Sequence, residues 1–512
     1  MNLISISIFL CGLVLSSECM NILGIFPINI RSHVRVFQSL MTELAVKGHD
    51  VTVVSHYPLE KPIERYKHVS LRGVCPLFVE TVDVENLYNY NRIDMYVAPT
   101  ELSQWGQGIC ESTYFSERLS EVWDTNRTYD LMVVEMFNTD CFLPISSKFN
   151  IPVIAISSSE LLPWVSFRFG IPLNPSYMPS IFMGYPRKLN FLQRFENSLL
   201  TWTHLLFHRF IRNVKDDAVA RRYLNVTLPV REYANNVSIL LVNTHHTLHN
   251  AKPYPPNVIE IGGIHLPDKN ELPQNIEKFI NESKHGVIYF SLGSMIKGHT
   301  FPQEKKDAFL KAFARLPQRV LWKWENETMP GKPDNVMIQK WMPQFDILSH
   351  PNVKAFISHG GLLGTTEAVH CGVPMMVMPQ YGDQYTNAKA VEANGGGVIL
   401  YLKDATEEKV YNNLKTILDP EFRAKAKALS ERFRDRPMSP MDTAIYWVEY
   451  VARHKGAPHM KTAAVDMPLY QYLLLDVLAF LGLILLVFSY ISYKILSLVL
   501  RSVFSKKKVK QN

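Results

Sequence analysis

Two long stretches of this chain each predict buried strands that alternate with helices. The first opens with an apolar run at 21–28, continues with apolar positions at helical spacing over 34–47, and returns to an apolar run at 51–55. Further strands of this stretch are predicted at 129–135, 151–157 and 240–244. Strand, helix and strand in this order form the unit of a parallel sheet, so the stretch predicts one α/β domain.

The same alternation restarts after a proline-rich stretch at 251–267, which is typical of a linker. Strands are predicted at 286–294, 320–324, 336–341, 353–358 and 375–379, with helices over 303–315 and 365–372. Within the first stretch, between the strands at 151–157 and 240–244, residues 165–235 are rich in aromatic and basic residues, and their pattern is irregular. Parallel sheets bind ligands at the carboxyl ends of their strands, so the cleft between two such domains is the expected site.

The two ends of the chain predict targeting segments rather than further domains. Residues 3–15 are apolar and lead to small residues before Cys19, which resembles a secretory signal peptide, although no positive charge precedes the run. The run at 468–493 is long enough to cross a bilayer as a helix, with Asp476 near its start. Positive charges follow this run and place the tail in the cytosol, which predicts a type I protein with lumenal catalytic domains.

A lumenal chain should carry acceptors for N-glycosylation, and five sequons are present. They are Asn126, Asn225, Asn236, Asn281 and Asn326. The tail ends in Lys508-Val509-Lys510-Gln511-Asn512, which resembles a dilysine signal for retrieval to the endoplasmic reticulum. Four cysteines remain after the signal segment, without CxxC or metal-ligand spacing, so one disulfide is possible and no pairing is selected.

Composition narrows the class of function only a little. The 512 residues exceed one ordinary domain, and 47% hydrophobic with 20% charged residues is normal for a globular protein. Part of the formal charge of +7 lies in the basic tail, so nucleic-acid binding is not predicted.

The candidate chemistry lies around residues 341–384. His359 and a glycine-rich turn follow the strand at 353–358, and backbone N–H groups at such a turn can approach an anion. Glu367 follows, where a carboxylate can accept hydrogen bonds from vicinal hydroxyls such as those of ribose. Upstream, Trp341 ends another strand and could stack on a base, while Gln344 offers both donor and acceptor groups to its edge. Each feature alone also fits an ordinary strand, turn and helix, and the spacing is not the GxGxxG of dinucleotide-binding folds.

Taken together, these motifs resemble the UDP-glycosyltransferases, most closely the membrane-bound animal branch and its arthropod members. The resemblance rests on WMPQ (341–344), SHGGLLGTTEAVHCGVPMMVMPQYGDQ (358–384), the N-terminal Ser32-His33, the stretch 434–459, the apolar run and the basic tail. It implies an α/β GT-B fold, with two Rossmann-like domains facing a cleft and one C-terminal transmembrane helix. It also implies inverting transfer of a hexose from a UDP-sugar.

The resulting organisation assigns each segment a role. It comprises a signal peptide at 1–19, an N-terminal acceptor-binding Rossmann-like domain at 20–245, a linker and start of the second domain at 246–285, a C-terminal UDP-sugar-binding Rossmann-like domain at 286–460, the transmembrane helix at 468–493 and a basic cytosolic tail at 494–512. The resemblance further implies location in the endoplasmic reticulum membrane and a role in detoxification or biosynthesis. A homo- or heterodimer is an open possibility.

The resemblance also assigns the donor site residue by residue. Trp341 would stack on uracil, Gln344 would bond its edge, and Glu367 would bind ribose. The diphosphate would be held by His359, Gly361, Gly364, Thr365 and, nearby, Ser294. Hydroxyls of the transferred sugar would be bound by Asp383 and Gln384. UDP-sugar is then a co-substrate, and neither a cofactor nor a metal is expected.

The catalytic base is expected from the first domain. His33 follows the first strand, and its ordinary pKa range suits it to take a proton from an acceptor hydroxyl. Such a base is usually oriented by a carboxylate. Glu135 keeps the strand-end position expected for this partner, whereas Asp140 keeps the residue type, and both alternatives remain open.

The donor sugar and the acceptor are less defined. Glucose is expected from the resemblance to arthropod members, with a small lipophilic acceptor bound by residues of about 80–200. Glucuronosyl transfer is the alternative, and Lys252 is a candidate partner for a sugar carboxylate. A non-catalytic membrane protein that binds UDP-sugars or lipophilic ligands is the alternative of a different class, and a dinucleotide oxidoreductase is disfavoured by the missing fingerprint.

Overall fold

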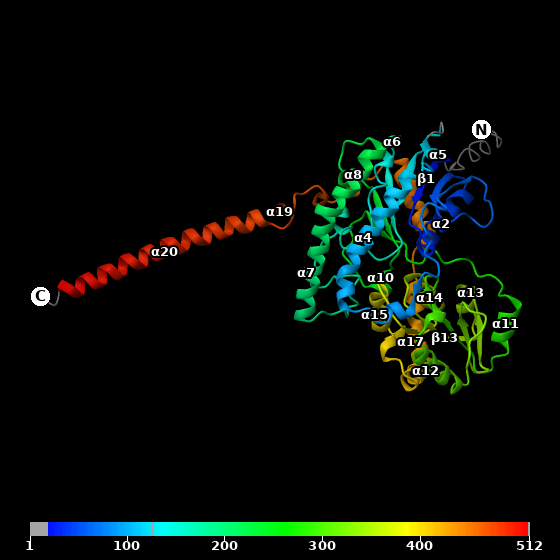
Figure 1. Ribbon diagram of the computed structural model, residues 1–512. Helices are drawn as coiled ribbons and strands as arrows, with labels where there is room; N and C mark the ends of the chain where they lie inside the picture. The colour runs from blue at the N-terminus through cyan, green and yellow to red at the C-terminus, as the bar shows by residue number, and fades with distance from the viewer. Residues whose placement is uncertain (1–18, 124–126, 510–512) are drawn as a thin grey trace, which may run out of the picture. The chain divides into compact units, whose positions relative to one another are not determined.

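The structure is a computed structural model that describes residues 19–123 and 127–509 (Figure 1). The predicted signal peptide up to residue 18, the sequon at Asn126 and the last three residues of the tail lie outside the described residues. The chain divides into two compact units, one up to Lys461 and one from Thr462 onward. The first unit contains two parallel sheets, and we call the parts built on them the first half and the second half.

The first half is built on a seven-stranded parallel sheet in the order β3-β2-β1-β5-β6-β7-β8. Its strands are β1 (Asn21–Phe26), β2 (Asp50–Ser55), β3 (Tyr66–Ser70), β5 (Leu131–Glu135), β6 (Val153–Ser157), β7 (Ile239–Val242) and β8 (Val258–Glu260). The central strands are buried throughout, which explains their continuous apolar runs. β8 lies within the expected linker and pairs with β7, so this stretch completes the first sheet.

The helices of the first half cover both faces of that sheet. They are α2 (Arg31–Val46), α4 (Arg92–Phe115), α5 (Ser120–Trp123), α6 (Ile145–Phe149), α7 (Phe191–Phe207), α8 (Asn213–Leu224) and α9 (Val230–Asn235), with a 3₁₀ turn η1 (Ser166–Phe169) and a π turn η2 (His208–Arg212). Two short helices of this part of the chain, α3 (Val84–Leu87) and α10 (His246–His249), instead bury Val84 and Leu248 in the core of the second half. α2 buries Phe37, Leu40 and Leu44 completely against the strands. Each such side chain contributes about 1.5–3 kcal/mol, which fixes the helix that begins next to the cleft.

The second half is built on a six-stranded parallel sheet in the order β12-β11-β9-β13-β14-β15. Its strands are β9 (Val287–Ser291), β11 (Arg319–Lys323), β12 (Val336–Gln339), β13 (Val353–Ser358), β14 (Met375–Val377) and β15 (Gly397–Ile399). Its helices are α11 (Gln274–Asn281), α12 (Gln303–Ala314), α13 (Gln344–Leu348), α14 (Leu362–Cys371), α15 (Gln384–Ala393), α16 (Glu407–Leu418) and α17 (Pro420–Arg434), with 3₁₀ turns η3 (Gly298–Thr300) and η4 (Leu402–Asp404). The predicted strands and helices of this half are all present.

The contacts that tie the halves together include a strand pair and a returning helix. β4 (Val82–Asp83) of the first half pairs in parallel with β10 (Ile296–Lys297) of the second. α18 (Pro440–Arg453), which follows the second sheet in the chain, contacts α2 and β7 and packs Ala444, Ile445 and Val448 into the core of the first half. Residues 440–453 therefore belong structurally to the first half, although the predicted boundary placed them in the second domain.

The second unit contains the C-terminal helices. They are η6 (Ala463–Val465), α19 (Leu469–Tyr472) and α20 (Leu475–Val509), while η5 (Pro458–Met460) ends the first unit. Among the described residues, α20 contains a segment long and apolar enough to cross a bilayer, Leu475–Ser502, with a mean hydropathy of 2.3. The predicted span began seven residues earlier. The helix starts later because Leu474 adopts a φ of 54°, which interrupts right-handed helix.

Candidate functional site

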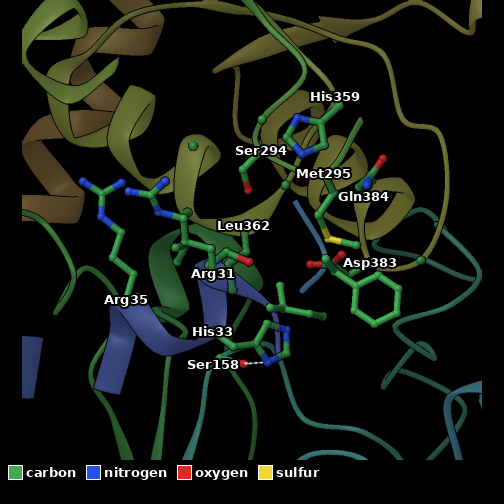
Figure 2. A pocket seen from close by; sticks show the side chains of 18 of the residues that line it. Arg31, His33, Arg35, Ser158, Ser294, Met295, His359, Leu362, Asp383 and Gln384 are labelled. Carbon is green, nitrogen blue, oxygen red and sulfur yellow. Dashed lines mark hydrogen bonds between the residues drawn. The ribbon is translucent and has the colours of Figure 1, made fainter. Parts of the chain in front are cut away.

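The carboxyl ends of both sheets open onto one cavity of about 1330 Å³. Ten of the predicted site residues line it, namely His33, Ser294, Trp341, Gln344, His359, Gly361, Gly364, Glu367, Asp383 and Gln384. Figure 2 shows His33 and Ser158 on one side and Ser294, His359, Asp383 and Gln384 on the other. The topology explains this arrangement, because parallel strands place all their following loops at the same edge.

His33 lies in the first turn of α2 and is held by a buried carboxylate. Its Nδ1 is 2.6 Å from Glu135 Oε1, at the end of β5, and 2.8 Å from Ser158 Oγ, just after β6. The Ser158 hydroxyl donates to the same Glu135 oxygen at 3.1 Å. The ring also packs edge-on against Phe137, with centroids 4.6 Å apart. With Nδ1 engaged, Nε2 is the nitrogen left for a ligand in the cavity.

Of the two carboxylates considered for this partnership, the structure pairs Glu135 with His33. Asp140 instead forms a buried bidentate ion pair with Arg168 and accepts no hydrogen bond from His33 among those of the described residues. Burial raises the pKa of Asp140, while the Arg168 guanidinium lowers it. The Asp140 alternative is therefore wrong, because the chain turns away from the sheet edge after Glu135 and buries Asp140 beside η1.

The wall predicted to hold a nucleoside is formed by Trp341, Gln344 and Glu367. Trp341 is 55% exposed, an unusual state for so large a ring, and this exposure suits a stacking platform rather than a core position. Gln344 Nε2 donates to Glu367 Oε2 at 2.6 Å. Burial raises the pKa of Glu367, and the Gln344 hydrogen bond opposes that rise. A buried carboxylate at the cavity surface is well prepared to accept hydrogen bonds from ligand hydroxyls.

The turn after β13 brings His359 against two glycine backbones. A Cβ on Gly361 would lie 2.5 Å from His359 Nε2, and one on Gly293, whose φ is 79°, would lie 2.7 Å from the ring. Side chains at these positions would displace the imidazole. Burial lowers the pKa of His359 to about 4, aided by the positive charge of Lys323, so the ring is neutral near pH 7.

Two predicted diphosphate residues differ in their placement. Ser294 lines the cavity in the loop between β9 and β10. Thr365 is fully buried within α14, its hydroxyl has no hydrogen-bond partner among the described residues, and it is absent from the described cavity lining. The structure therefore does not bring the Thr365 side chain to the cavity.

Asp383 and Gln384 lie at the start of α15 and face the first half. Asp383 accepts a hydrogen bond from Asn387 Nδ2 at 2.9 Å. Burial raises the pKa of Asp383, while the hydrogen bond from Asn387 and the nearby His33 lower it. Gln384 Oε1 accepts from the backbone of Gln380, which fixes the loop after β14.

Four of the cavity residues that sequence reasoning did not single out bear on its chemistry. Ser158 directly follows the predicted strand at 151–157, so the strand-end argument that selected Glu135 applies to it equally. Arg31 and Arg35 flank His33 in the first turns of α2. Lys323 ends β11. The helical spacing of Arg31 and Arg35 was visible in the sequence as a signal.

Several predicted features lie away from the cavity. The sequons at Asn225, Asn236, Asn281 and Asn326 are all exposed. Cys110 and Cys141 form a disulfide that joins α4 to the loop after β5, a pairing the sequence could not select. Lys252, the candidate partner of a sugar carboxylate, is instead buried in an ion pair with Glu160.

Comparisons with known proteins identify relatives of this chain. A family model described as "UDP-glucoronosyl and UDP-glucosyl transferase" matches residues 25–510. The chain is 46% identical to "UDP-glycosyltransferase UGT5" of Dactylopius coccus, over 91% of this chain and 89% of that protein. It is 36% identical to "UDP-glucuronosyltransferase 1A9" of Homo sapiens, over 78% and 74%. Among solved structures, "LpCGTa in complex with UDP" aligns with a TM-score of 0.54 at 16% identity, over 85% of this chain and 99% of that one.

Proposed function

The chain belongs to the family of UDP-glucuronosyl and UDP-glucosyl transferases, and on this premise we propose that it moves glucose from UDP-glucose to a hydroxyl of a small lipophilic acceptor. The predicted family resemblance is confirmed, as are the GT-B fold and the class of hexosyltransferases. The finer assignments, of sugar, acceptor and residue roles, form the proposal.

The observation that carries the proposal is the position of His33 opposite Asp383. Its Nδ1–H can donate to Glu135, which fixes the tautomer whose Nε2 lone pair faces the cavity. The buried carboxylate stabilises the imidazolium once His33 has taken a proton. This geometry suits His33 to act as a general base, with polar residues already arranged on the opposite side of the cavity.

The proposed reaction is a single displacement. An acceptor hydroxyl gives its proton to His33 Nε2 while its oxygen bonds to the anomeric carbon of glucose. The bond from that carbon to the β-phosphate oxygen breaks with its electron pair, and UDP leaves from the opposite face. The product is a β-glucoside. The α14 N-terminus and the turn at Gly360 and Gly361 would meet the charge that develops on the diphosphate.

Two observations favour glucose over glucuronate. One relative, 40% identical over 93% of this chain, is described as "UDP-glucosyltransferase 2" of Dactylopius coccus. In addition, Lys252 is paired with Glu160, and the sugar end of the cavity carries the Asp383 carboxylate, which repels a second one.

The acceptor end of the cavity favours an apolar ring compound. Phe78, Trp105 and Phe137 line it beside His33, with Trp105 edge-on to both phenylalanines. These surfaces contribute binding through burial of apolar area, and the hydroxyl then meets the base.

The test uses the full-length protein in microsomes with a panel of phenols. Wild type should release UDP and form β-glucosides when UDP-glucose and UDP-glucuronate are offered together. His33→Ala should lower kcat about a thousandfold and leave UDP affinity within twofold. Full transfer by His33→Ala would refute the mechanism, glucuronides as the main product would refute the donor, and UDP binding without turnover on any acceptor would favour a non-catalytic binding protein.

Residence in the lumen of the endoplasmic reticulum is supported by the Cys110–Cys141 disulfide and by four exposed sequons. Endoglycosidase H treatment of the expressed protein should raise its mobility, and substitution of each described sequon Asn by Gln should remove one increment. A protein whose mobility does not change on treatment would contradict this location.

A further inference from the structure

The first two turns of α2 carry two arginines beside His33 that have no role in the reaction proposed above. Arg31 and Arg35 are four residues apart, so their side chains leave the same face of the helix. Both line the cavity. Figure 2 shows both guanidinium groups extended from α2 away from His33, to the left of Ser294 in this view.

Each arginine contacts a residue predicted to hold the nucleoside. The Arg31 guanidinium carbon lies 4.8 Å from the centroid of the Trp341 ring, and Arg35 Nη1 lies 3.9 Å from Glu367 Oε1. The second distance is too long for a hydrogen bond. The side chains of Arg31 and Arg35 are 45% and 48% exposed. Both cations therefore reach the donor wall and retain free hydrogen-bonding capacity.

The donor wall itself is short of positive charge for a diphosphate. Among the described lining residues, the Lys and Arg side chains are Arg31, Arg35 and Lys323. Lys323 Nζ is already bound by two carboxylates, at 3.0 Å from Glu325 and 3.7 Å from Glu80. The neutral His359 adds a dipole and no charge. A UDP-sugar brings about two negative charges, so cations from across the cavity would add to what the backbone N–H groups at the α14 N-terminus supply.

We propose that Arg31 and Arg35 are diphosphate-binding residues of the donor site, supplied by the first half. The planar guanidinium suits paired phosphate oxygens, and neither arginine has to break a close ion pair to turn toward them. Because His33 lies in the same helix, binding of the diphosphate by the two arginines also positions His33 Nε2 next to the anomeric carbon. The inference rests on UDP-sugar being the donor, as proposed above.

The test measures the affinity of the full-length protein for UDP and for uridine by calorimetry. Arg31→Ala and Arg35→Ala should each raise the Kd for UDP about tenfold, and the double variant about a hundredfold. Affinity for uridine, which has no phosphate, should change less than twofold. Arg→Lys variants should recover part of the loss. Lys47→Ala, at the other end of α2, is the matched control and should bind UDP as wild type does.

The outcomes separate this inference from the proposed function. Unchanged UDP affinity in the double variant would overturn the role of the arginines while leaving the transferase intact. An equal loss for uridine and UDP would also overturn it, since the arginines would then act through Trp341 and Glu367. Unchanged UDP affinity together with weakened binding of UDP-glucuronate, titrated in the same way, would overturn it too and assign the arginines to a sugar carboxylate. If wild type binds no UDP at all, the proposed function itself fails. Thermal unfolding of each variant reports whether the fold is kept.

Discussion

The two halves place different kinds of group at the same edge of the same type of sheet. In the first half the edge carries a hydrogen-bonded set of side chains, His33, Glu135 and Ser158, drawn from three separate segments. In the second half it carries a glycine turn with a neutral His359 pressed against backbone. In the proposed reaction the first edge supplies the group that takes the proton, and the second edge supplies the backbone turn that meets the diphosphate.

This difference explains why the site residues of the second half are easier to recognise in the sequence than those of the first half. An anion is held largely by backbone N–H groups, so the second edge needs glycines at fixed spacing and leaves a contiguous motif. A proton-transfer set needs only that its members meet in space, and 125 residues separate His33 from Ser158. A sequence pattern therefore reveals the half whose site residues are contiguous in the chain, whichever half contributes more to the site.

The strongest test of this comparison is to neutralise, one at a time, the two carboxylates first considered as partners of His33. Glu135→Gln should lower kcat about a hundredfold, because the amide cannot stabilise the imidazolium. Asp140→Asn should leave kcat per folded molecule within twofold and lower stability by about 3–5 kcal/mol, since it leaves Arg168 buried without its partner charge. Steady-state kinetics and denaturant unfolding measure both, and the reverse pattern would return Asp140 to the site.

On the second edge, loss of a carboxylate should affect binding rather than turnover. Glu367→Gln should raise the KM for UDP-glucose about tenfold, with kcat and the acceptor KM little changed, because a charged acceptor of hydroxyl hydrogen bonds becomes neutral. Glu327→Gln, an exposed surface residue of the same half, is the control. A fall in kcat with no change in KM would place Glu367 in the chemical step.

Ser158 tests how far the first edge depends on its third member. Ser158→Ala removes a hydroxyl that contacts both His33 and Glu135, and it should lower kcat about threefold, with the remaining Glu135 contact keeping the tautomer. The pH–rate profile of this variant should shift relative to wild type, whereas a purely structural role would lower stability and leave the profile unchanged.

The smallest effect concerns the histidine of the second edge. The pKa of His359 in the folded protein, about 4, lies below its unfolded value near 6.5, so the unfolded chain binds more protons between these limits. The stability that this histidine contributes is therefore present above pH 6.5 and is lost as the pH falls toward 4. The thermal midpoint of wild type minus that of His359→Asn should decline by a few degrees over this range. A difference that grows on acidification would contradict the sign.

Much of the fold could be predicted because its strands are buried on both faces. Largely apolar runs such as 129–135 and 353–358 separate clearly from the helices between them. The donor wall was predicted through its motif. The His33 partner stayed open because the choice between Glu135 and Asp140 depends on where the chain turns after β5. Arg31 and Arg35 were missed because their significance depends on which half faces them, and the irregular segment 165–235 gave no period to follow.

The return of α18 to the first sheet sets a rule for building chimaeras from relatives of this protein. An exchange of first halves with one junction near residue 260 would combine a foreign sheet with the native Ala444, Ile445 and Val448, which pack into the core of the native first half. The transplanted piece should instead be discontinuous, carrying residues 440–453 along with the N-terminal segment. The two structural halves therefore come from three segments of the chain: the N-terminal segment, the segment that forms the second half, and residues 440–453, which return to the first half.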